Sequence, residues 1–327
     1  MSPYLVVHTD WHQHPLSSQE IEILRQMDIE VQPLAPRTDG AFLQVAARTD
    51  AVLNADFPIT AELLSALQKC RLISRYGSGI DNINVQAATR LGIPVANVPD
   101  FCAEAVATRA LLLILACSCS LLELNDYAKG GKWGLQGLPY ALELRGKTLG
   151  LVGFGKIARS VAIQAKGFGL EMIAYDPYVD DSVLKSFDVK PSDLDSLLRT
   201  SDFVSLHLPL SEKTRHILST PKLALMKPSS ILINTSRGAL VDEQALTAAL
   251  QERRLYAAGL DVFESEPPNV GHPLFGLKNV VITPHCAAHT REATSRVRQA
   301  ALDAIVAVFT KARPKHLVNP EALGRAS

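Results

Sequence analysis

Three residues, Arg237, Glu266 and His285, have side chains that could hold a carboxylate and move a proton. The planar guanidinium of arginine presents paired donors that match a carboxylate. The imidazole of histidine can give and regain a proton near neutral pH, and a neighbouring carboxylate favours its protonated form. Together the three could bind a small 2-keto acid and protonate its oxygen during reduction. Taken singly, each could equally be a surface arginine, a loop glutamate or a capping histidine.

A short apolar run of β-type residues precedes each of these positions. The runs cover residues 230–234, 255–260 and 280–282. They alternate with helical patterns, and such alternation predicts an α/β fold whose parallel sheet is covered on both faces. Parallel strands share one carboxyl edge, and ligands bind beyond it. We therefore expect Arg237, the segment that ends in Glu266, and His285 to converge at that edge.

A Gly-x-Gly-x-x-Ala pattern that begins at Gly153 follows a predicted strand, 149–152, and opens a predicted helix. The first glycine permits a sharp turn, and Gly155 lets a diphosphate approach the amides at the helix start. An ordinary strand-to-helix turn is the alternative. A second predicted strand, 171–175, ends 23 positions after Gly153 at Asp176, where a dinucleotide ribose needs an acceptor. Without Arg or Lys beside Asp176 to neutralise a 2′-phosphate, the pattern favours NAD over NADP.

The segment Tyr76-Gly77-Ser78-Gly79 follows another predicted strand, 72–75. Its two glycines free the amides between them to point at one spot, and a backbone nest of this kind can hold a carboxylate. A plain tight turn is the alternative, whereas a second nucleotide fingerprint would need a long helix that does not follow. We expect all four residues to bind substrate. Tyr76 and residues near Asn54 and Trp133 are expected to set the substrate side chain.

With 327 residues, 47% of them hydrophobic, and a net charge of zero, the chain is expected to form two globular domains. It has no basic run for nucleic acid, no signal sequence, and no apolar stretch long enough for a membrane span. Its five cysteines are scattered without CxxC spacing, which fits thiols in a reducing cytoplasm. His8, His12 and His14 lack accompanying metal ligands, so we expect surface or loop histidines and no metal site.

The pattern from Ala103 to Leu122 is apolar on nearly every face. A helix of this kind must be covered on every side. We therefore expect it to lie between domains or between subunits, and this predicts an oligomer. A long helical pattern at 291–310 is expected to cross back onto the first domain.

Three motifs resemble those of the D-isomer-specific 2-hydroxyacid dehydrogenases. They are Asn234-Thr235-Ser236-Arg237-Gly238 with Val241-Asp242-Glu243, then Gly259-Leu260-Asp261-Val262-Phe263-Glu264-Ser265-Glu266-Pro267, and Thr283-Pro284-His285. With the two glycine segments, the resemblance covers nearly the whole chain. It implies an NAD-dependent enzyme that interconverts a small D-2-hydroxy acid and its 2-keto acid, with Arg237, Glu266 and His285 as catalytic residues. Formate dehydrogenases of the family carry Gln at the position of Glu266, so formate oxidation is disfavoured.

The same resemblance implies the domain arrangement. A doubly wound parallel-sheet (Rossmann) cofactor domain, residues 102–292, is expected to be inserted into a discontinuous flavodoxin-like substrate domain, residues 1–101 and 293–327. Hinges near residues 101 and 293 would open and close a cleft, and homodimers would form through the cofactor domains. Asp261 would contact the nicotinamide amide. The implied cofactor contacts are Ser78, Val106, Gly153, Gly155, Lys156, Ile157, Asp176, Leu208, Pro209, Thr235, Ser236, Arg237, Asp261, His285 and Ala287.

Other interpretations stay open. Within the family, residues 97–106 are most similar to the branch of the C-terminal-binding proteins. This branch includes transcriptional corepressors, so the chain could be a binding module that holds NAD as a structural ligand. Phosphoglycerate dehydrogenases are similar around Arg75, but Leu53 stands where they tend to carry a second phosphate-binding arginine, and no regulatory domain follows Ser327. A non-carbon hydride donor such as phosphite is a third interpretation. The motifs determine neither the substrate side chain nor the physiological direction.

Overall fold

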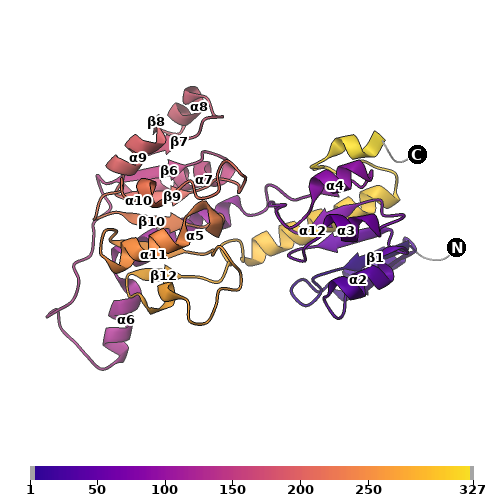
Figure 1. Cartoon of the computed structure of the whole chain (residues 1–327), viewed down its shortest axis with the longest axis horizontal. Coiled ribbons are helices and arrows are strands. Elements are labelled where there is room, and N and C mark those ends of the chain that lie inside the picture. Colours follow the sequence, from indigo (N-terminus) through magenta and orange to yellow (C-terminus); the bar gives the residue numbers. More distant parts are fainter. Residues whose placement is uncertain (1–3, 325–327) are drawn as a thin grey trace. The chain divides into compact units, whose positions relative to one another are not determined.

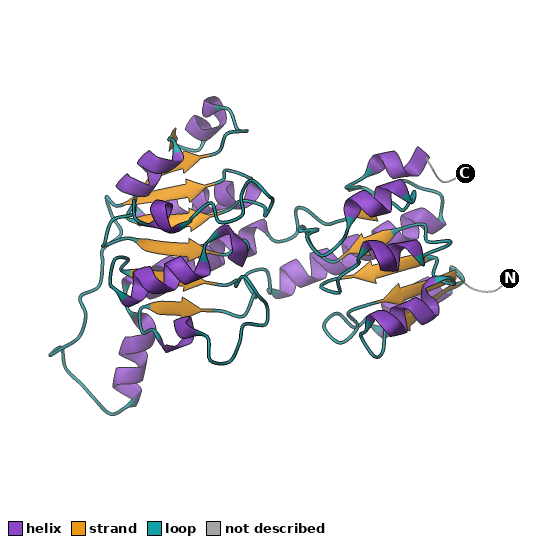
Figure 2. Ribbon diagram, in the orientation of Figure 1, coloured by secondary structure: helices purple, strands orange, loops and turns teal. Residues whose placement is uncertain are grey.

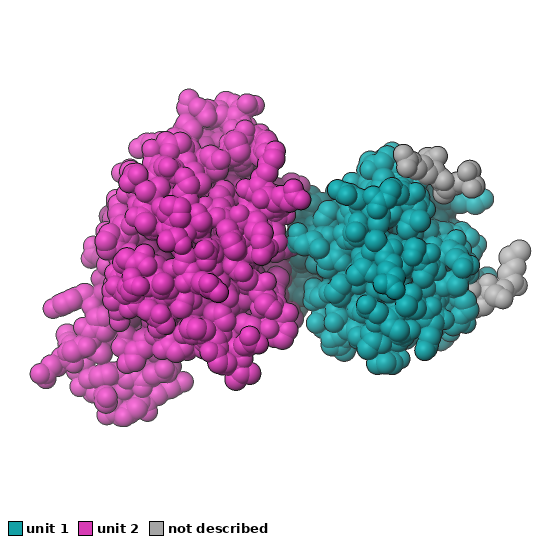
Figure 3. Space-filling model, in the orientation of Figure 1, with its two compact units in different colours: residues 1–101, 290–327 teal, residues 102–289 magenta. Residues whose placement is uncertain are grey.

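The structure, a computed structural model, describes residues 4–324 (Figure 1). Helices and parallel strands alternate along the chain (Figure 2). The chain divides into two compact units: unit 1 holds the residues up to 101 and from 290 onward, and unit 2 holds residues 102–289 (Figure 3). The sequence placed the C-terminal boundary of the cofactor domain at residue 292, whereas unit 2 ends at residue 289. Thr290 already belongs with unit 1, because its hydroxyl caps helix α12 (Arg291–Phe309) of that unit.

Unit 2 is built on a seven-stranded sheet in which every pairing is parallel. The order across the sheet is β12-β11-β10-β9-β6-β7-β8. From β8 to β11 this is the 3-2-1-4-5-6 order of a doubly wound dinucleotide-binding domain, and it reverses between β6 and β9, where such sheets bind ligands. The predicted Rossmann fold is confirmed. The strands are β6 (Thr148–Val152), β7 (Glu171–Tyr175), β8 (Val189–Pro191), β9 (Phe203–Leu206), β10 (Ile231–Asn234), β11 (Ala257–Leu260) and β12 (Val280–Ile282).

Both faces of this sheet are buried. Successive strand residues alternate between two hydrophobic clusters: Ile231 and Ile233 belong to one and Leu232 to the other. The helices of unit 2 are α5 (Ala103–Ser118), α6 (Leu121–Lys129), α7 (Lys156–Ala165), α8 (Asp181–Ser186), α9 (Leu194–Thr200), α10 (Thr220–Leu223) and α11 (Glu243–Gln251), with the 3-10 turns η1 (Lys166–Phe168), η2 (Gly238–Leu240) and η3 (Pro273–Gly276).

Helix α5 lies in the core of unit 2 itself. It packs against α7, β10 and β11, and Ala110, Leu113 and Ile114 are buried there. A sheet and a neighbouring helix of the same unit therefore cover most of this apolar helix. Leu112 on α5 is 46% exposed, and a contact of this helix with another subunit stays a prediction. No single helix within residues 4–324 is long and apolar enough to span a membrane, and α5 with α6 meets that test only as a pair bent by 59°.

Unit 1 contains a five-stranded parallel sheet of order β2-β1-β3-β4-β5. This is the 2-1-3-4-5 order of flavodoxin-like folds, as predicted. The chain returns to this unit through α12: Val297, Ala301 and Ile305 join its core, and the Ser74 hydroxyl donates to the Ala301 carbonyl at 2.9 Å. The elements are β1 (Tyr4–His8), β2 (Ile29–Pro33), β3 (Ala51–Asn54), β4 (Ile73–Arg75), β5 (Val95–Ala96), α1 (Ser18–Arg25), α2 (Asp39–Ala46), α3 (Ala61–Ser65), α4 (Val85–Arg90), α12 and the 3-10 turn η4 (Pro320–Gly324).

The N-terminal histidines only partly follow the prediction. His12 and His14 lie in the loop after β1, but His8 lies in the strand itself and is fully buried. The apolar residues that precede it in β1 are also buried, so the strand takes His8 into the interior of unit 1. Within residues 4–324, no group of three or more His, Cys, Asp or Glu side chains could hold a metal ion.

Candidate active site

The turn from β6 into α7 has the form that a pyrophosphate needs. Gly153 has a φ of 92°, and a Cβ there would lie 2.8 Å from the carbonyl oxygen of His207, so only glycine fits. A Cβ added to Gly155 would meet nothing within 4 Å, so the backbone is open to a ligand at this point. Gly155 is also the N-cap of α7 and brings no side chain to the first amides of the helix. These amides and the positive end of the helix dipole therefore suit a phosphate.

Asp176 closes the same turn from the end of β7. Its Oδ2 accepts a hydrogen bond from the Phe154 amide at 2.8 Å, and its Oδ1 accepts one from the Tyr178 amide at 2.9 Å. A carboxylate has about four lone-pair positions, so acceptors remain for ribose hydroxyls. At the end of β10, the Thr235 hydroxyl is buried and has no hydrogen-bond partner within residues 4–324. A bound dinucleotide could supply that partner, so the residues present fit NAD.

Replacing Asp176 with alanine is expected to weaken NADH binding about tenfold or more, because a hydrogen bond to a charged group is worth about 1.5–3 kcal/mol. NADPH should lose less, since the repulsion of its 2′-phosphate disappears with the carboxylate. Fluorescence titration of both cofactors measures the two effects. Asp181→Asn, which changes an exposed acid in the first turn of α8, is the matched control. Equal losses for NADH and NADPH would contradict the assignment.

The carboxyl ends of β10, β11 and β12 are joined by backbone hydrogen bonds. The Asp261 amide donates to the Asn234 carbonyl at 2.9 Å, and the His285 amide donates to the Asp261 carbonyl at 2.8 Å. Gly238 lets the loop after β10 pack on the next loop, because a Cβ there would lie only 1.9 Å from the carbonyl carbon of Phe263. Within unit 2, the structure therefore brings together the three strand ends that the sequence predicted to meet.

His285 and Glu266 form the central pair of this block. The Nδ1 of His285 lies 2.6 Å from the Oε2 of Glu266, whose Oε1 accepts the Phe263 amide at 2.9 Å. The hydrogen bond to Glu266 raises the pKa of His285 above its usual value. Burial would raise the pKa of Glu266, but hydrogen bonds from His285 and the Phe263 amide outweigh it and hold this pKa below its usual value. The pair therefore favours a protonated ring beside an ionised carboxylate.

Arg237 supplies a positive charge beside this pair. Its carbonyl accepts the side-chain amide of Asn234 at 2.8 Å, and its Nη1 donates to the Ser236 carbonyl at 2.7 Å. Its charge lies close enough to lower the pKa of both His285 and Glu266. A guanidinium in this place can hold a carboxylate ligand while the imidazole gives a proton to an adjacent atom.

Asp261 holds the loop that carries His285. Its carboxylate accepts hydrogen bonds from the Thr283 hydroxyl, from the Cys286 amide at 3.0 Å and from the Ala287 amide at 2.8 Å. The residue is only 1% exposed. The structure thus gives Asp261 a positioning role, and its contact with the nicotinamide amide stays a prediction.

The other predicted cofactor residues of unit 2 lie mostly at the carboxyl edge of the sheet. Ser236 connects two strand ends, since its hydroxyl donates to the Leu206 carbonyl at 2.7 Å. Val106 on α5 and Ala287 after β12 are buried, so they can offer a ligand little beyond backbone atoms. The remaining residues are Lys156 and Ile157 in the first turn of α7, Leu208 and Pro209 after β9, and Thr235 after β10.

His207 directly follows β9. Burial lowers its pKa to about 4, so the ring is neutral near pH 7. Its Nε2 lies 2.9 Å from the Ser205 hydroxyl, and its carbonyl packs against Gly153. The structure therefore gives His207 the role of a support for the glycine turn.

The predicted carboxylate-binding turn, Tyr76–Gly79, lies in unit 1 after β4. A Cβ on Gly77 would lie 1.7 Å from the Nη1 of Arg75, whose guanidinium packs directly on the turn. The side-chain amide of Asn97 donates to the Ser78 carbonyl at 2.7 Å. The sequence analysis assigned neither Arg75 nor Asn97 to this turn. The position of Arg75 just before the glycines could have indicated its contact with the turn, but no pattern in the sequence indicates the contact of Asn97.

The side chain of Tyr76 departs from its predicted role. It is 5% exposed, and its ring stacks with those of His8 and His14 at centroid distances of 5.4 and 5.1 Å. Burial also raises the pKa of its hydroxyl. Because the ring belongs to the core of unit 1, it does not line a substrate pocket, and substrate binding by this turn is left to Gly77, Ser78 and Gly79.

Comparison with known proteins identifies the family. Residues 111–287 match the model of the D-isomer-specific 2-hydroxyacid dehydrogenase, NAD-binding domain. The chain belongs to this family. Glyoxylate reductase of Korarchaeum cryptofilum is 40% identical over 293 residues, 88% of either chain. Hydroxypyruvate reductase of Thermotoga maritima is 45% identical over 248 residues, 75% of this chain and 80% of the relative. A D-lactate dehydrogenase from Aquifex aeolicus, solved with NAD and lactic acid, has a TM-score of 0.84 at 26% identity and matches 96% of this chain and 99% of its own.

Family membership establishes the class of reaction. The protein is an NAD-dependent oxidoreductase that acts on the CH–OH group of 2-hydroxy acids. The matched NAD-binding segment, 111–287, falls within unit 2. The findings concern the family as a whole, so the branch of the C-terminal-binding proteins stays a prediction.

Proposed function

We propose that this dehydrogenase reduces glyoxylate or hydroxypyruvate with NADH, and that His285, held by Glu266, is its acid–base group. The observation that carries the proposal is the 2.6 Å contact between the His285 Nδ1 and the Glu266 Oε2, with the charge of Arg237 beside it. The names of two relatives, a glyoxylate reductase and a hydroxypyruvate reductase, support the choice of substrates.

The roles follow from the geometry of the pair. Bound NAD supplies or accepts the hydride. Glu266 engages the Nδ1 of His285, which leaves Nε2 to carry the proton that moves. In reduction Nε2 gives this proton to the carbonyl oxygen, and in oxidation it takes the hydroxyl proton back. Arg237 binds the substrate carboxylate and so fixes the distance between the reacting carbon and the ring.

We assign the cofactor to unit 2 and substrate recognition to unit 1. The family match to an NAD-binding domain and the glycine turn after β6 support the first assignment. The positive φ of Gly77 supports the second. Because the Gly77 amide already donates to the Arg75 carbonyl at 3.0 Å, the amides of Ser78 and Gly79 are the proposed further binders of the substrate carboxylate.

A phosphorylated substrate is a weaker candidate. Leu53, which stands where phosphoglycerate dehydrogenases tend to carry a second arginine, is fully buried in β3. This position therefore offers no ligand for a phosphate, although Arg75 lies at the turn.

A panel of keto acids tests the proposal. Purified protein should consume NADH with glyoxylate or hydroxypyruvate faster than with pyruvate, phenylpyruvate or 3-phosphohydroxypyruvate, and hydroxypyruvate should yield the D enantiomer of glycerate. The absorbance of NADH measures the rate, and fluorescence titration measures NADH binding. Saturable NADH binding without turnover of any member would refute the proposal and favour a binding module that holds NAD.

We also propose a cytoplasmic homodimer joined through unit 2. No residue of α6 is buried, and in the following loop Trp133, Leu135 and Tyr140 are 93%, 89% and 94% exposed. Apolar surface of this kind usually marks a protein contact. None of the five cysteines is in a disulfide, which fits a reducing compartment. Sedimentation equilibrium should give twice the mass of one chain, and a monomer at every concentration would contradict the dimer.

A further inference from the structure

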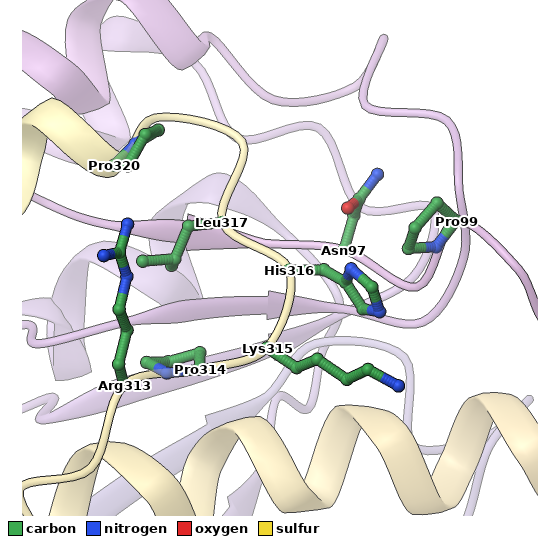
Figure 4. Close-up of a pocket in the computed structure, with 8 residues that line it drawn as sticks. All are labelled: Asn97, Pro99, Arg313, Pro314, Lys315, His316, Leu317 and Pro320. Carbon is green, nitrogen blue, oxygen red and sulfur yellow. The ribbon is translucent and has the colours of Figure 1, made fainter.

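Unit 1 contains a pocket of about 540 Å³ that the proposed reaction does not use. The loop after β5 forms one side, and the segment between α12 and η4 forms the other (Figure 4). This volume lies within the range of about 300–1,000 Å³ that small-molecule sites occupy. The lining residues are Asn97, Pro99, Arg313, Pro314, Lys315, His316, Leu317 and Pro320.

The charge of this pocket has one sign. Arg313 and Lys315 carry positive charges, His316 can donate an N–H, and no acidic residue lines the pocket. Within residues 4–324, none of these three side chains forms a salt bridge or a side-chain hydrogen bond, although ion pairs occur elsewhere in the chain. The guanidinium of Arg313 runs past Leu317, while Lys315 and His316 extend toward the other end of the pocket (Figure 4). Donors spread in this way suit an anion larger than a single halide.

The walls of the pocket are held in place by the fold. The Leu317 backbone forms an antiparallel bridge with Ala96, and the Val318 amide donates to the Val95 carbonyl at 2.8 Å. Asn319 reinforces this pairing, since its side-chain oxygen accepts the Val95 amide at 2.7 Å. Three prolines in the lining further restrict the backbone. The basic side chains are therefore displayed by a backbone that is already ordered.

The pocket is connected to the glycine turn by short hydrogen bonds. Asn97 lines the pocket, and its side-chain amide donates to the Ser78 carbonyl at 2.7 Å. The next amide, that of Val98, donates to the Gly77 carbonyl at 2.9 Å, and the Asn97 amide donates to the His316 carbonyl at 3.2 Å. A ligand that fixes Asn97 and His316 therefore also restrains the turn at Gly77 and Ser78.

We propose that this pocket is a regulatory site for a small organic phosphate. The phosphate group binds Lys315 and the His316 ring, and Arg313 at the other end of the pocket donates to the organic part of the ligand (Figure 4). Occupancy of the pocket changes the order of the Gly77–Gly79 turn. The binding site stands independently of the proposed reaction, whereas the effect on the turn rests on the proposed binding of substrate there. The experiment therefore measures binding and turnover separately.

Calorimetric titration with glycerol 3-phosphate, at constant ionic strength, tests the binding step. Wild-type protein should bind it saturably, and the double variant Arg313→Gln/Lys315→Gln should bind it at least about tenfold more weakly, because each charge-assisted hydrogen bond contributes about that much. Lys129→Gln/Lys132→Gln removes the same charge from exposed residues of unit 2 and is the matched control. Glycerol at the same concentration should not bind. Absence of saturable binding, or equal binding by the wild type and the Arg313/Lys315 variant, would overturn the site.

Keto-acid kinetics with and without glycerol 3-phosphate test the coupling. In the wild type the ligand should change the KM for the keto acid about twofold or more with little change in kcat, since the turn is expected to bind substrate rather than to move a proton. The Arg313/Lys315 variant should show wild-type kinetics without the ligand and no response to it. Saturable binding with an unchanged KM would overturn the regulatory role.

Discussion

Replacing His285 with asparagine should lower kcat/KM for keto-acid reduction by about 10²- to 10⁴-fold, the usual contribution of a general acid. Asparagine is the sharper substitution because His285 has a φ of 48°. Asparagine tolerates this left-handed conformation better than most residues, and it can hydrogen bond but cannot give up a proton near pH 7. The backbone of the loop should therefore survive while the acid is lost.

NADH binding separates this outcome from damage to the cofactor site. The His285→Asn variant should bind NADH as the wild type does, because the glycine turn and Asp176 follow β6 and β7, away from the loop after β12. His289→Asn, at an exposed histidine a few residues further on, is the control and should keep full activity. If His285→Asn retained turnover within about threefold of the wild type, another group would have to donate the proton.

Replacing Arg237 with alanine should lower kcat/KM by about 10²- to 10⁴-fold, most of it through a higher KM for the keto acid. A bidentate pair with a carboxylate comprises two charge-assisted hydrogen bonds, each worth about 1.5–3 kcal/mol. Arg237→Lys should recover only part of the loss, since an ammonium keeps the charge but lacks the planar fork. Steady-state kinetics in the keto acid at saturating NADH measure these effects.

Arg254→Ala is the control for this substitution. Arg254 pairs with Glu252 on the surface, so its loss should leave the kinetics unchanged. The melting temperature of each variant checks that the block of loops is intact. A loss in Arg237→Ala that appeared only in NADH affinity would show that the residue serves the cofactor and not the substrate.

The convergence of the strand ends could be predicted from the sequence because it depends on a general property of parallel sheets. Apolar runs at 230–234, 255–260 and 280–282 identify the strands, and parallel pairing places the residues that follow them at one edge. The pairing of His285 with Glu266 needed the motifs as well, since a strand end alone does not say where a side chain in the next loop points. The glycine pattern that begins at Gly153 likewise identified the turn between β6 and α7.

Burial was the main source of error. Tyr76 follows a strand and precedes two glycines, and nothing near it in the chain shows that the rings of His8 and His14 cover it. The helix at 103–118 shows a related limit, because an apolar pattern indicates that a helix is covered but not by which elements. In this structure β10, β11 and α7 cover most of it, and Leu112 stays exposed.

The basic pocket of unit 1 could not be predicted from local patterns. Asn97 and Pro99 are separated from Arg313 and Lys315 by more than two hundred positions, and the antiparallel bridge between Ala96 and Leu317 brings the two segments together. Each segment read alone is an ordinary polar loop. Only the pairing of the C-terminal segment with the edge strand makes them one site.

The pH dependence of kcat/KM for the wild type and for Glu266→Gln tests the central claim most directly. Reduction needs protonated His285, and kcat/KM reports this group in the free enzyme. The hydrogen bond to Glu266 raises the pKa of His285, so the wild-type rate should be highest at low pH and fall as the pH rises through that raised pKa. Glutamine can still accept a hydrogen bond but carries no charge, so the pKa of His285 should drop and the fall should move to lower pH. If the two profiles coincided, Glu266 would not be what keeps His285 protonated, and the proposed acid–base pair would be contradicted.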